Sequence, residues 1–457
     1  MRGPTMRSPR VRGMFDRAVL VAVVSVAAFA TAAVAQSPMP PAPPQSAPIL
    51  IHGATIHTVS AEEGVPPVLE NGWLLIRDGR IDALGDATTK PAEDQSWEII
   101  DAAGLHLCPG FHAMDTQLGL VETMAVRSTD DRRETGDVTP EVVPAVAINP
   151  DSDLIPVARA GGVLLASVVP TGGLVPGWCS TIRLDGWTPE DLAIEDRAGL
   201  VVNWPMMRTV RSSWMRRSEG EQRERLESRL KTLEETFEAA AAWRDAGEDR
   251  PADRRREEVA RTLGGERPIL MSCGSAAQIE AAIAFASRHG VRISIVGGPG
   301  ALECAELLAE RGIAVVVDGV HRLPRRRHDR PGEPFELAGR LHAAGVPVAI
   351  AAMEEPAHER NLPHQAASAA AHGLPPEAAL AAITRVPAEI VGIADRYGSL
   401  APGRSATLLV LDGPPLEVST TPVAAFIDGR RLDLSNRHTR QRDKYLEKYR
   451  RLGLIEE

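Results

Sequence analysis

The chain has 457 residues, a formal net charge of −10 at pH 7 and 44% hydrophobic residues. This length and composition predict a globular protein with one large domain and one small domain. No stretch carries the sustained basic excess that phosphate binding requires, which argues against a nucleic-acid partner. Only 4% of the residues are aromatic, so stacking platforms for sugars or bases are disfavoured as well. The expected partner is a small-molecule ligand or substrate.

The first 35 residues have the form of a signal peptide. Several arginines precede an apolar run that begins at Ala18 and ends in Ala33-Val34-Ala35, a pattern that predicts cleavage before Gln36 and export to the periplasm or out of the cell. The run is about as long as the shortest membrane-spanning helices, so an uncleaved anchor is the alternative. We expect no other contact with a membrane. A proline-rich linker is predicted at 36–48.

Short strand-like runs at both ends of the chain predict a small β-domain. The first are I-L-I-H-G-A-T-I-H-T and W-L-L-I-R-D-G-R-I-D-A-L-G, in which Asp78-Gly79 is a hairpin signal. Two more runs lie between 406 and 431, with Asp428-Gly429 as a second turn signal. We predict a composite β-sandwich made of 49–108 and 401–432.

Between these ends, strand-like runs alternate with helical patterns. The strand-like runs are 162–169, 267–273, 291–297, 313–318 and 346–352, and the helical patterns that follow strands are 278–289, 300–311 and 336–344. This alternation is typical of parallel sheets and barrels. The predicted fold class is therefore α/β, with a (β/α)8 TIM-type barrel at 109–400.

Two further helical segments flank this alternation. The charged segment 218–263 carries an apolar stripe, so we expect it to pack on the outside or the rim of the barrel. The stripe residues are Leu226, Leu230, Leu233 and Phe237. The C-terminal segment 433–457 is predicted to be a mixed-charge helical tail, docked by Tyr445 and Tyr449.

The cysteines lie far apart and show no C-x-x-C spacing, which disfavours both a zinc motif and a dense disulfide framework. They are Cys108, Cys179, Cys273 and Cys304. Buried free thiols are expected, although export would permit one disulfide, whose partners the sequence does not identify.

The stretch 105–120, L-H-L-C-P-G-F-H-A-M-D-T-Q-L-G-L, predicts the first barrel strand. Barrel enzymes place their chemistry at the carboxyl ends of the strands, and here the polar residues at that end are Asp115 and Gln117. The two alternate along the strand, so both are expected to point to one face.

Four stretches resemble the amidohydrolase superfamily, and within it the imidazolonepropionase-like branch. They are I-H-G-A-T-I-H-T with D-G-R-I-D-A-L-G, then L-C-P-G-F, then L-P-P-E-A-A-L-A-A-I-T-R-V-P-A-E-I-V-G-I, and finally Y-G-S-L-A-P-G-R-S-A-T-L-L-V-L-D-G-P-P-L-E. The likeness covers roughly 49–432. It implies a hydrolase of non-peptide C–N bonds, such as those of cyclic amides, and is compatible with a homodimer.

The resemblance also implies one or two divalent metals, held by H-x-H on strand 1, histidines on strands 5 and 6, and an aspartate on strand 8. Here those positions are Asp115-Thr116-Gln117, Ser272, Gly297-Gly298 and Ala352-Met353. None of these residues supplies an imidazole, and a zinc site needs three or four donors. The standard metal centre is therefore expected to be absent, and no cofactor is predicted.

The remaining polar residues give the site assignments. A metal-free acid and base set is assigned to Asp115, His321 and Glu354, and substrate binding to Gln117, Ser272 and Met353. A surface or structural role is the competing interpretation for His321. Two functions stay open: a metal-independent or weakly active hydrolase, and a non-catalytic ligand-binding pseudoenzyme of the cell envelope.

Overall fold

The computed structural model describes residues 39–212, 215–324, 329–352 and 355–456. The predicted signal peptide at 1–35, the first residues of the linker, Met353 and Glu354 lie outside the described residues. Among the helices described, none is both long and apolar enough to cross a membrane.

The larger unit is a nearly closed barrel of eight strands. The strands follow one another in chain order around the sheet, and the first and last lie side by side. They are β6 (Phe111–Thr116), β7 (Val163–Val168), β8 (Gly177–Arg183), β9 (Ala193–Asn203), β10 (Ile269–Cys273), β11 (Ile293–Gly297), β12 (Val315–Asp318) and β13 (Val348–Ala351). The predicted barrel is therefore present, and every predicted strand overlaps a strand of it.

One strand departs from the predicted (β/α)8 order, because β8 runs antiparallel to both β7 and β9. The connection from β7 turns through Gly172 and Gly173, whose φ angles are 84° and 64°. A parallel neighbour needs a long crossover, whereas a short turn brings the chain back antiparallel. The expectation of a helix after each strand was therefore wrong here.

Small apolar side chains fill the interior of the barrel. They are Met114, Leu165, Cys179, Val201, Leu270, Val296, Val316, Ala349 and Ala351, all buried in one cluster. Successive residues of a strand point to opposite faces, so the next inward positions after Leu270 and Val316 are Ser272 and Asp318. Both lie at the carboxyl end of the barrel, which we call the mouth.

The smaller unit is an eight-stranded sheet built from both ends of the chain, in the order β16-β15-β14-β5-β1-β2-β3, with β4 paired to β1. Its strands are β1 (Ile49–His57), β2 (Val68–Arg77), β3 (Arg80–Gly85), β4 (Glu98–Asp101), β5 (His106–Pro109), β14 (Leu408–Leu411), β15 (Pro422–Ile427) and β16 (Arg430–Arg431). The strands belong to one hydrogen-bonded sheet, so the sandwich itself stays a prediction.

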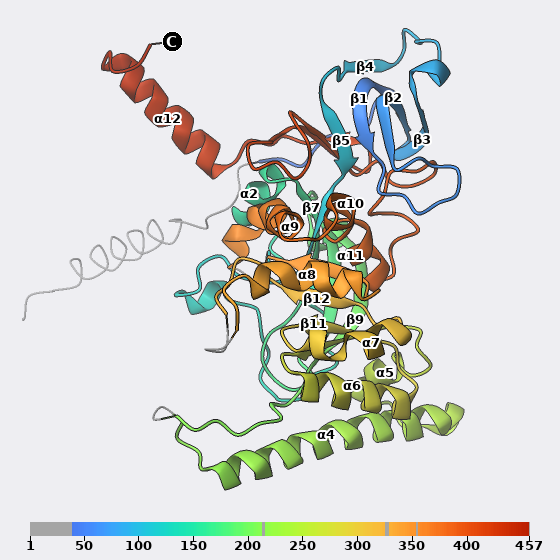
Figure 1. Cartoon of the computed structure of the whole chain (residues 1–457), viewed down its shortest axis with the longest axis vertical. Coiled ribbons are helices and arrows are strands. Elements are labelled where there is room, and N and C mark those ends of the chain that lie inside the picture. Colours follow the sequence, from blue (N-terminus) through green and yellow to red (C-terminus); the bar gives the residue numbers. More distant parts are fainter. Residues whose placement is uncertain (1–38, 213–214, 325–328, 353–354, 457) are drawn as a thin grey trace, which may run out of the picture.

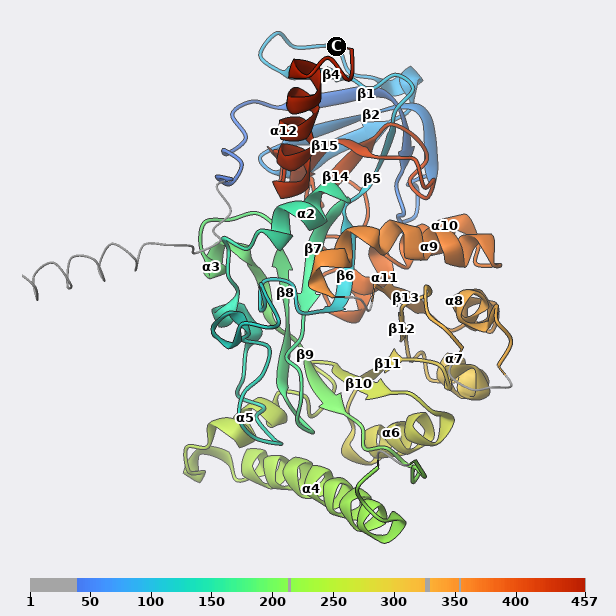
Figure 2. The ribbon, with the colours of Figure 1, turned by 90° about the vertical axis from the view of Figure 1, so that its left-hand side faces the viewer.

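Helices cover the outside of the barrel (Figures 1 and 2). They are α2 (Leu154–Ala160), α3 (Pro189–Leu192), α5 (Arg254–Ala260), α6 (Ala276–His289), α7 (Ala305–Glu310), α8 (Glu333–Ala343), α9 (Leu362–Ala371), α10 (Pro376–Ala381) and α11 (Arg385–Ile390). Helices α6, α7, α8 and α9 follow β10, β11, β12 and β13 in turn, as the alternation of the sequence predicts.

The segment 218–263 contains two helices, α4 (Glu219–Asp245) and α5, because the chain turns at Gly247, whose φ is 65°. Helix α4 lies at the end of the molecule opposite the small sheet (Figures 1 and 2). The stripe residues Leu233 and Phe237 are buried against the barrel helices, which confirms the predicted packing.

Helix α12 (Arg437–Arg451) projects from the body of the protein (Figure 1). It has no buried residue, and Tyr445 and Tyr449 are 47% and 41% exposed. The prediction that these tyrosines dock the tail was wrong. Both Lys444 and Lys448 lie over the Tyr445 ring, so this side of the helix is charged as well as aromatic.

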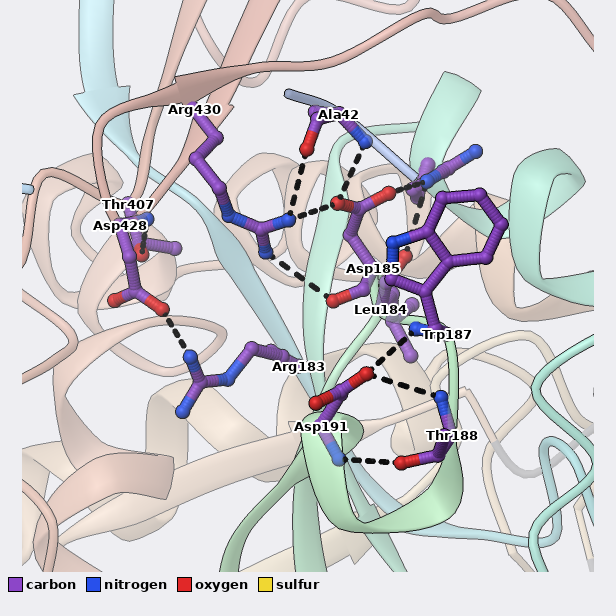
Figure 3. Close-up of polar contacts among 11 residues, drawn as sticks. Ala42, Arg183, Leu184, Asp185, Trp187, Thr188, Asp191, Thr407, Asp428 and Arg430 are labelled. Atoms are coloured by element: carbon purple, nitrogen blue, oxygen red, sulfur yellow. Dashed lines mark hydrogen bonds and ion pairs between the residues drawn. The ribbon is translucent and has the colours of Figure 1, made fainter. Parts of the chain in front are cut away.

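A buried ion-pair cluster joins the small sheet to the barrel (Figure 3). The carboxylate of Asp185, just after β8, accepts hydrogen bonds from Arg159 of α2 at 2.5 Å and from Arg430 of β16 at 2.7 Å. The backbone N–H of Ala42 donates to the same carboxylate at 3.1 Å. Three segments distant in sequence therefore meet at one carboxylate.

Candidate functional site

The carboxyl end of β6 is irregular at the residue that the sequence singled out. Asp115 has a φ of 53°, and the pairing of β6 with β7 shifts register between Ala113 and Thr116. Such a bulge bends the strand and re-aims a side chain. The regular alternation that placed Asp115 and Gln117 on one face is therefore broken at Asp115.

Asp115 is coupled to a second carboxyl group at the mouth. Burial raises the pKa of Asp115 to about 7, and the negative charge of Asp318 raises it further. Asp318 is the last residue of β12 and is 6% exposed, and its Oδ1 lies 3.8 Å from Nε of Arg322. Near neutral pH, one end of the barrel thus holds a partly protonated carboxyl beside a second, buried one.

The sequence-based assignment missed Asp318. It is the final residue of the predicted strand at 313–318, so the preference of barrel enzymes for polar residues at strand ends was a signal that could have found it. Its coupling to Asp115 depends on the closure of the barrel, which brings strands 1 and 7 together across a long stretch of sequence.

His321 makes its hydrogen bonds to α9, and its assignment to the acid and base set stays a prediction. Its side chain is exposed, and Nε2 lies 2.6 Å from Oγ of Ser368 on α9. Its backbone N–H donates to Gln365 at 2.9 Å. The chain turns at Gly319, whose φ is 75°, and carries His321 towards α9.

The predicted substrate-binding residues Ser272 and Gln117 lie at or just after the ends of different strands and differ in exposure. Ser272 lies at the carboxyl end of β10 with an exposed side chain. Gln117 is half-buried after β6, and its carbonyl accepts the N–H of Leu120 at 3.0 Å. Met353 and Glu354 lie outside the described residues, so the ligand-binding assignment stays a prediction.

The strand 6 position leaves no room for a ligating side chain. Gly297, at the end of β11, has a φ of 122°, and a Cβ built on it would lie 2.7 Å from the carbonyl oxygen of Cys273. Real Cβ atoms do not approach a backbone atom so closely. A histidine at this position would require the backbone to move.

The carboxyls that the structure describes at the ends of β6 and β12 are fewer than a zinc centre needs. Asp115 and Asp318 are two carboxyls, whereas zinc takes three or four protein donors and prefers imidazole or thiolate among them. Within the ranges that the structure describes, no group of three or more His, Cys, Asp or Glu side chains is placed to hold a metal.

Beneath the carboxyls, the barrel contains a neutral polar cluster. His112 is fully buried with Nε2 2.8 Å from Oγ of Ser167, which lies 3.0 Å from Oγ1 of Thr181. Burial lowers the pKa of His112 to about 3, and it raises the pKa of the Cys179 thiol to about 12. The imidazole is therefore neutral, and Cys179 is not an activated nucleophile.

A cavity of about 370 Å³ opens at the same end of the barrel. Its lining comes from the loops after β9, β10 and β11 and from α8, and includes Met206, Met207, Arg208, Gly274, Ser275, Gln278, Pro299, Glu303, Asp329 and Glu333. A space of this size accommodates a small organic molecule. Ser272 is not among the residues that line it.

All four cysteines are buried free thiols, as the sequence predicts, and none forms a disulfide.

Comparisons with known proteins agree with this architecture. The structure of an amidohydrolase from Thermotoga maritima superposes with a TM-score of 0.70 at 26% identity, covering 84% of this chain and 99% of that one. The structure of molinate hydrolase superposes with a TM-score of 0.50 at 18% identity, covering 85% and 95%, a likeness of fold alone. The fold is thus that of the barrel hydrolases of the amidohydrolase superfamily.

The sequence comparisons find a likeness to the same group of proteins. Residues 268–433 match the model of the amidohydrolase family. The amidohydrolase tasK of Hapsidospora irregularis is 24% identical, over 84% of this chain. The chain spans only 43% of the length of that relative. The part of the chain at 268–433 is therefore similar to the amidohydrolase family.

Proposed function

We propose that the protein is a hydrolase of non-peptide C–N bonds, of the imidazolonepropionase-like branch, that works without the zinc centre of that branch. The observation that carries this proposal is the coupled pair Asp115 and Asp318, in which Asp115 has a pKa of about 7. Two neighbouring carboxyls that hold one proton between them can act as acid and base. The match of residues 268–433 to the amidohydrolase family model and the residues at the strand ends support the reaction class.

In this mechanism the ionised Asp318 accepts a proton from water as the water oxygen attacks the carbonyl carbon. Protonated Asp115 donates its proton to the carbonyl oxygen, which gives a neutral tetrahedral intermediate. When the C–N bond breaks, the oxygen returns its proton to Asp115 and the leaving nitrogen takes the proton held by Asp318. Both carboxyls finish in their starting states, and one water is consumed.

The test uses purified protein with its metal content measured, then assayed on cyclic amides and N-acyl amino acids with and without a chelator. Asp115→Asn and Asp318→Asn should each lower turnover by about 100-fold or more, the usual contribution of one acid or base. The exposed Glu134→Gln is the control. Stoichiometric zinc, or turnover that chelation abolishes, contradicts the proposal.

A second candidate is a ligand-binding protein without catalysis. The conformation of Gly297 favours it, because the backbone itself excludes a side chain at one metal-ligand position. This candidate predicts that cyclic amides raise the melting temperature without being consumed. The first proposal predicts consumption of the ligand, so product analysis in the same samples separates the two.

We also propose that the protein is exported to the periplasm or secreted, and that a homodimer forms. The arginines before the apolar run, and the Ala33-Val34-Ala35 ending, support export. N-terminal sequencing of the mature protein should begin at Gln36, and a cytoplasmic protein that retains Met1 would contradict this. Light scattering tests the dimer.

A further inference from the structure

A second cavity, of about 460 Å³, lies where the small sheet meets the barrel. We call it the junction pocket, and its lining is Pro44, Gln45, Asp78, Gly79, Arg80, Arg183, Arg396, Tyr397, Ser405, Asp428 and Arg430. Because β8 runs antiparallel to its neighbours, its last residue, Arg183, lies at the end of the barrel opposite the mouth. The junction pocket is therefore separate from Asp115 and Asp318.

The lining carries an excess of positive charge. It contains four arginines and two aspartates, which leaves a net charge of +2. The carboxylate of Asp185, which does not line the junction pocket, pairs with Arg430 and also with the buried Arg159. The charges of Asp185 and Arg159 cancel, so these two residues add no net charge. Figure 3 shows Arg183 paired with Asp428 and Arg430 paired with Asp185.

The main carboxylate of the junction pocket is already saturated with donors. Oδ1 of Asp428 accepts from the Tyr397 hydroxyl at 3.0 Å and from Oγ of Ser405 at 2.7 Å. Oδ2 accepts from Nη1 of Arg183 at 2.6 Å. Asp428 therefore has little capacity left to neutralise further N–H groups, and Asp78 is the other carboxylate of the lining.

The guanidinium groups, in contrast, have donors to spare, since each carries five N–H bonds. Arg80 donates through Nη1 to the carbonyl of Gly403 at 2.7 Å. Arg396 lies over the Tyr397 ring at 5.7 Å, and its Nε is 3.8 Å from Oδ1 of the exposed Asp395. Within the described part of the chain, the buried Nε of Arg183 has no hydrogen-bond partner.

The walls of the junction pocket are held by two hairpin tips. The turns Asp78-Gly79 and Asp428-Gly429 have positive φ at both residues, as two-residue hairpins require. A Cβ on Gly429 would lie 2.8 Å from Cα of Gly79, so the tips are in direct contact. Gln45 fixes them from the N-terminal segment, because its Oε1 accepts the N–H of Gly79 at 2.9 Å. A pocket with such supported walls needs little reorganisation on binding.

We propose that the junction pocket binds a small organic polyanion, one with at least two phosphate or carboxylate charges. The planar fork of arginine matches both groups through paired N–H bonds. The lining comes from the N-terminal segment, the small sheet and the barrel, so the bound anion bridges all three. Binding thus stabilises the junction between the two units at a distance from the mouth.

The test is a thermal-shift and calorimetric titration of the full chain with pyrophosphate in one arm and citrate in another. Sodium chloride at matched ionic strength is the reference, because general screening is not saturable. We expect a saturable rise in melting temperature with at least one anion. The arm with the lower dissociation constant identifies the phosphate or the carboxylate class.

Two variants locate the binding. The double variant Arg80→Gln with Arg396→Gln should weaken binding about tenfold or more, since each charge-assisted hydrogen bond contributes on that order. The matched control is Arg77→Gln with Arg431→Gln, which removes two exposed arginines paired with Asp82 and Glu98, outside the lining. The control should bind as the unmodified protein does.

A third variant is expected to bind more tightly, a result that loss of folding cannot produce. Asp78→Asn removes a carboxylate of the lining, and asparagine tolerates the positive φ of 50° at this turn. It should tighten binding several-fold. The proposal is overturned if neither anion gives a saturable shift beyond that of sodium chloride, or if the double variant and its control bind equally. Unchanged affinity in Asp78→Asn would also overturn it.

Discussion

At the scale of single residues, Asp115 makes folding depend on pH. Its pKa in the folded protein is about 7, raised from 3.8 by burial first and by Asp318 second. Below about pH 4 the carboxyl is protonated in both states and costs nothing. As the pH rises towards 7, the unfolded chain releases the proton while the folded protein retains it, so the free energy of unfolding falls.

Asp115→Asn should remove this dependence. The variant is expected to match the unmodified protein in stability near pH 4 and to exceed it at pH 8. The upper limit is about 4 kcal/mol for a shift of this size, and the gain will be smaller because water reaches part of the side chain. Urea unfolding at both pH values measures it, with the exposed Asp131→Asn as control. A constant difference across this range would contradict the pKa shift.

Gly297 offers a second test at this scale. Gly297→Ala should destabilise the protein by about 3 kcal/mol, because the new Cβ adds a clash with the Cys273 carbonyl to an unfavourable φ. Gly312 is the matched control, with a φ of 62° and no atom within 4 Å of a built Cβ. Its change to alanine should cost about 1 kcal/mol. Equal costs in denaturant melts would show that the Cys273 contact is not limiting.

At the scale of elements, α4 shows how a weak sequence pattern becomes a specific contact. The helix begins with a capping box at Ser218 and Glu221, and it carries many residues of both charge signs. Only part of the predicted stripe is fully buried. Phe237 packs edge-on against Phe285 of α6, with ring centroids 5.0 Å apart, whereas Leu226 is only partly buried. The spacing identifies the apolar side, but the partner helix decides which of its residues become buried.

Two alanine variants compare the ends of this stripe. Phe237→Ala should cost about 3–5 kcal/mol, the usual cost of removing a buried aromatic side chain. Leu226→Ala should cost less, about 1–2 kcal/mol, because part of its side chain stays in contact with water in the folded protein. Chemical denaturation of both measures the difference. A small effect of Phe237→Ala would mean that α4 is not part of the folded core.

At the scale of the whole molecule, the sequence predicts what depends on local pattern and misses what depends on closure. The strands at 313–318 and 346–352 follow from apolar runs, and both Asp-Gly turns follow from residue type. The reversed strand β8 was missed, since the sequence does not state the direction in which a strand pairs. Asp318 was missed as a partner of Asp115 for the same reason: their coupling exists only after the barrel has brought the two strands together.

The same closure makes Asp185 a centre of stability for the whole chain. Its side chain is 1% exposed, and it pairs with Arg159 on the barrel side and Arg430 on the sheet side. Asp185→Ala should cost about 3–5 kcal/mol, because it leaves the buried guanidinium of Arg159 without a carboxylate.

The control for Asp185 is the pair Arg431 and Glu98, which also joins distant strands, at 3.2 Å, but is about half exposed on both sides. Glu98→Ala should cost less than about 1 kcal/mol, since water screens exposed ion pairs. A double-mutant cycle of Asp185→Ala with Arg430→Ala then isolates the coupling across the junction. A coupling energy near zero would mean that apolar contacts and backbone hydrogen bonds hold the sheet to the barrel. The ion pairs would then only supply hydrogen-bond partners to charged groups that are buried on folding.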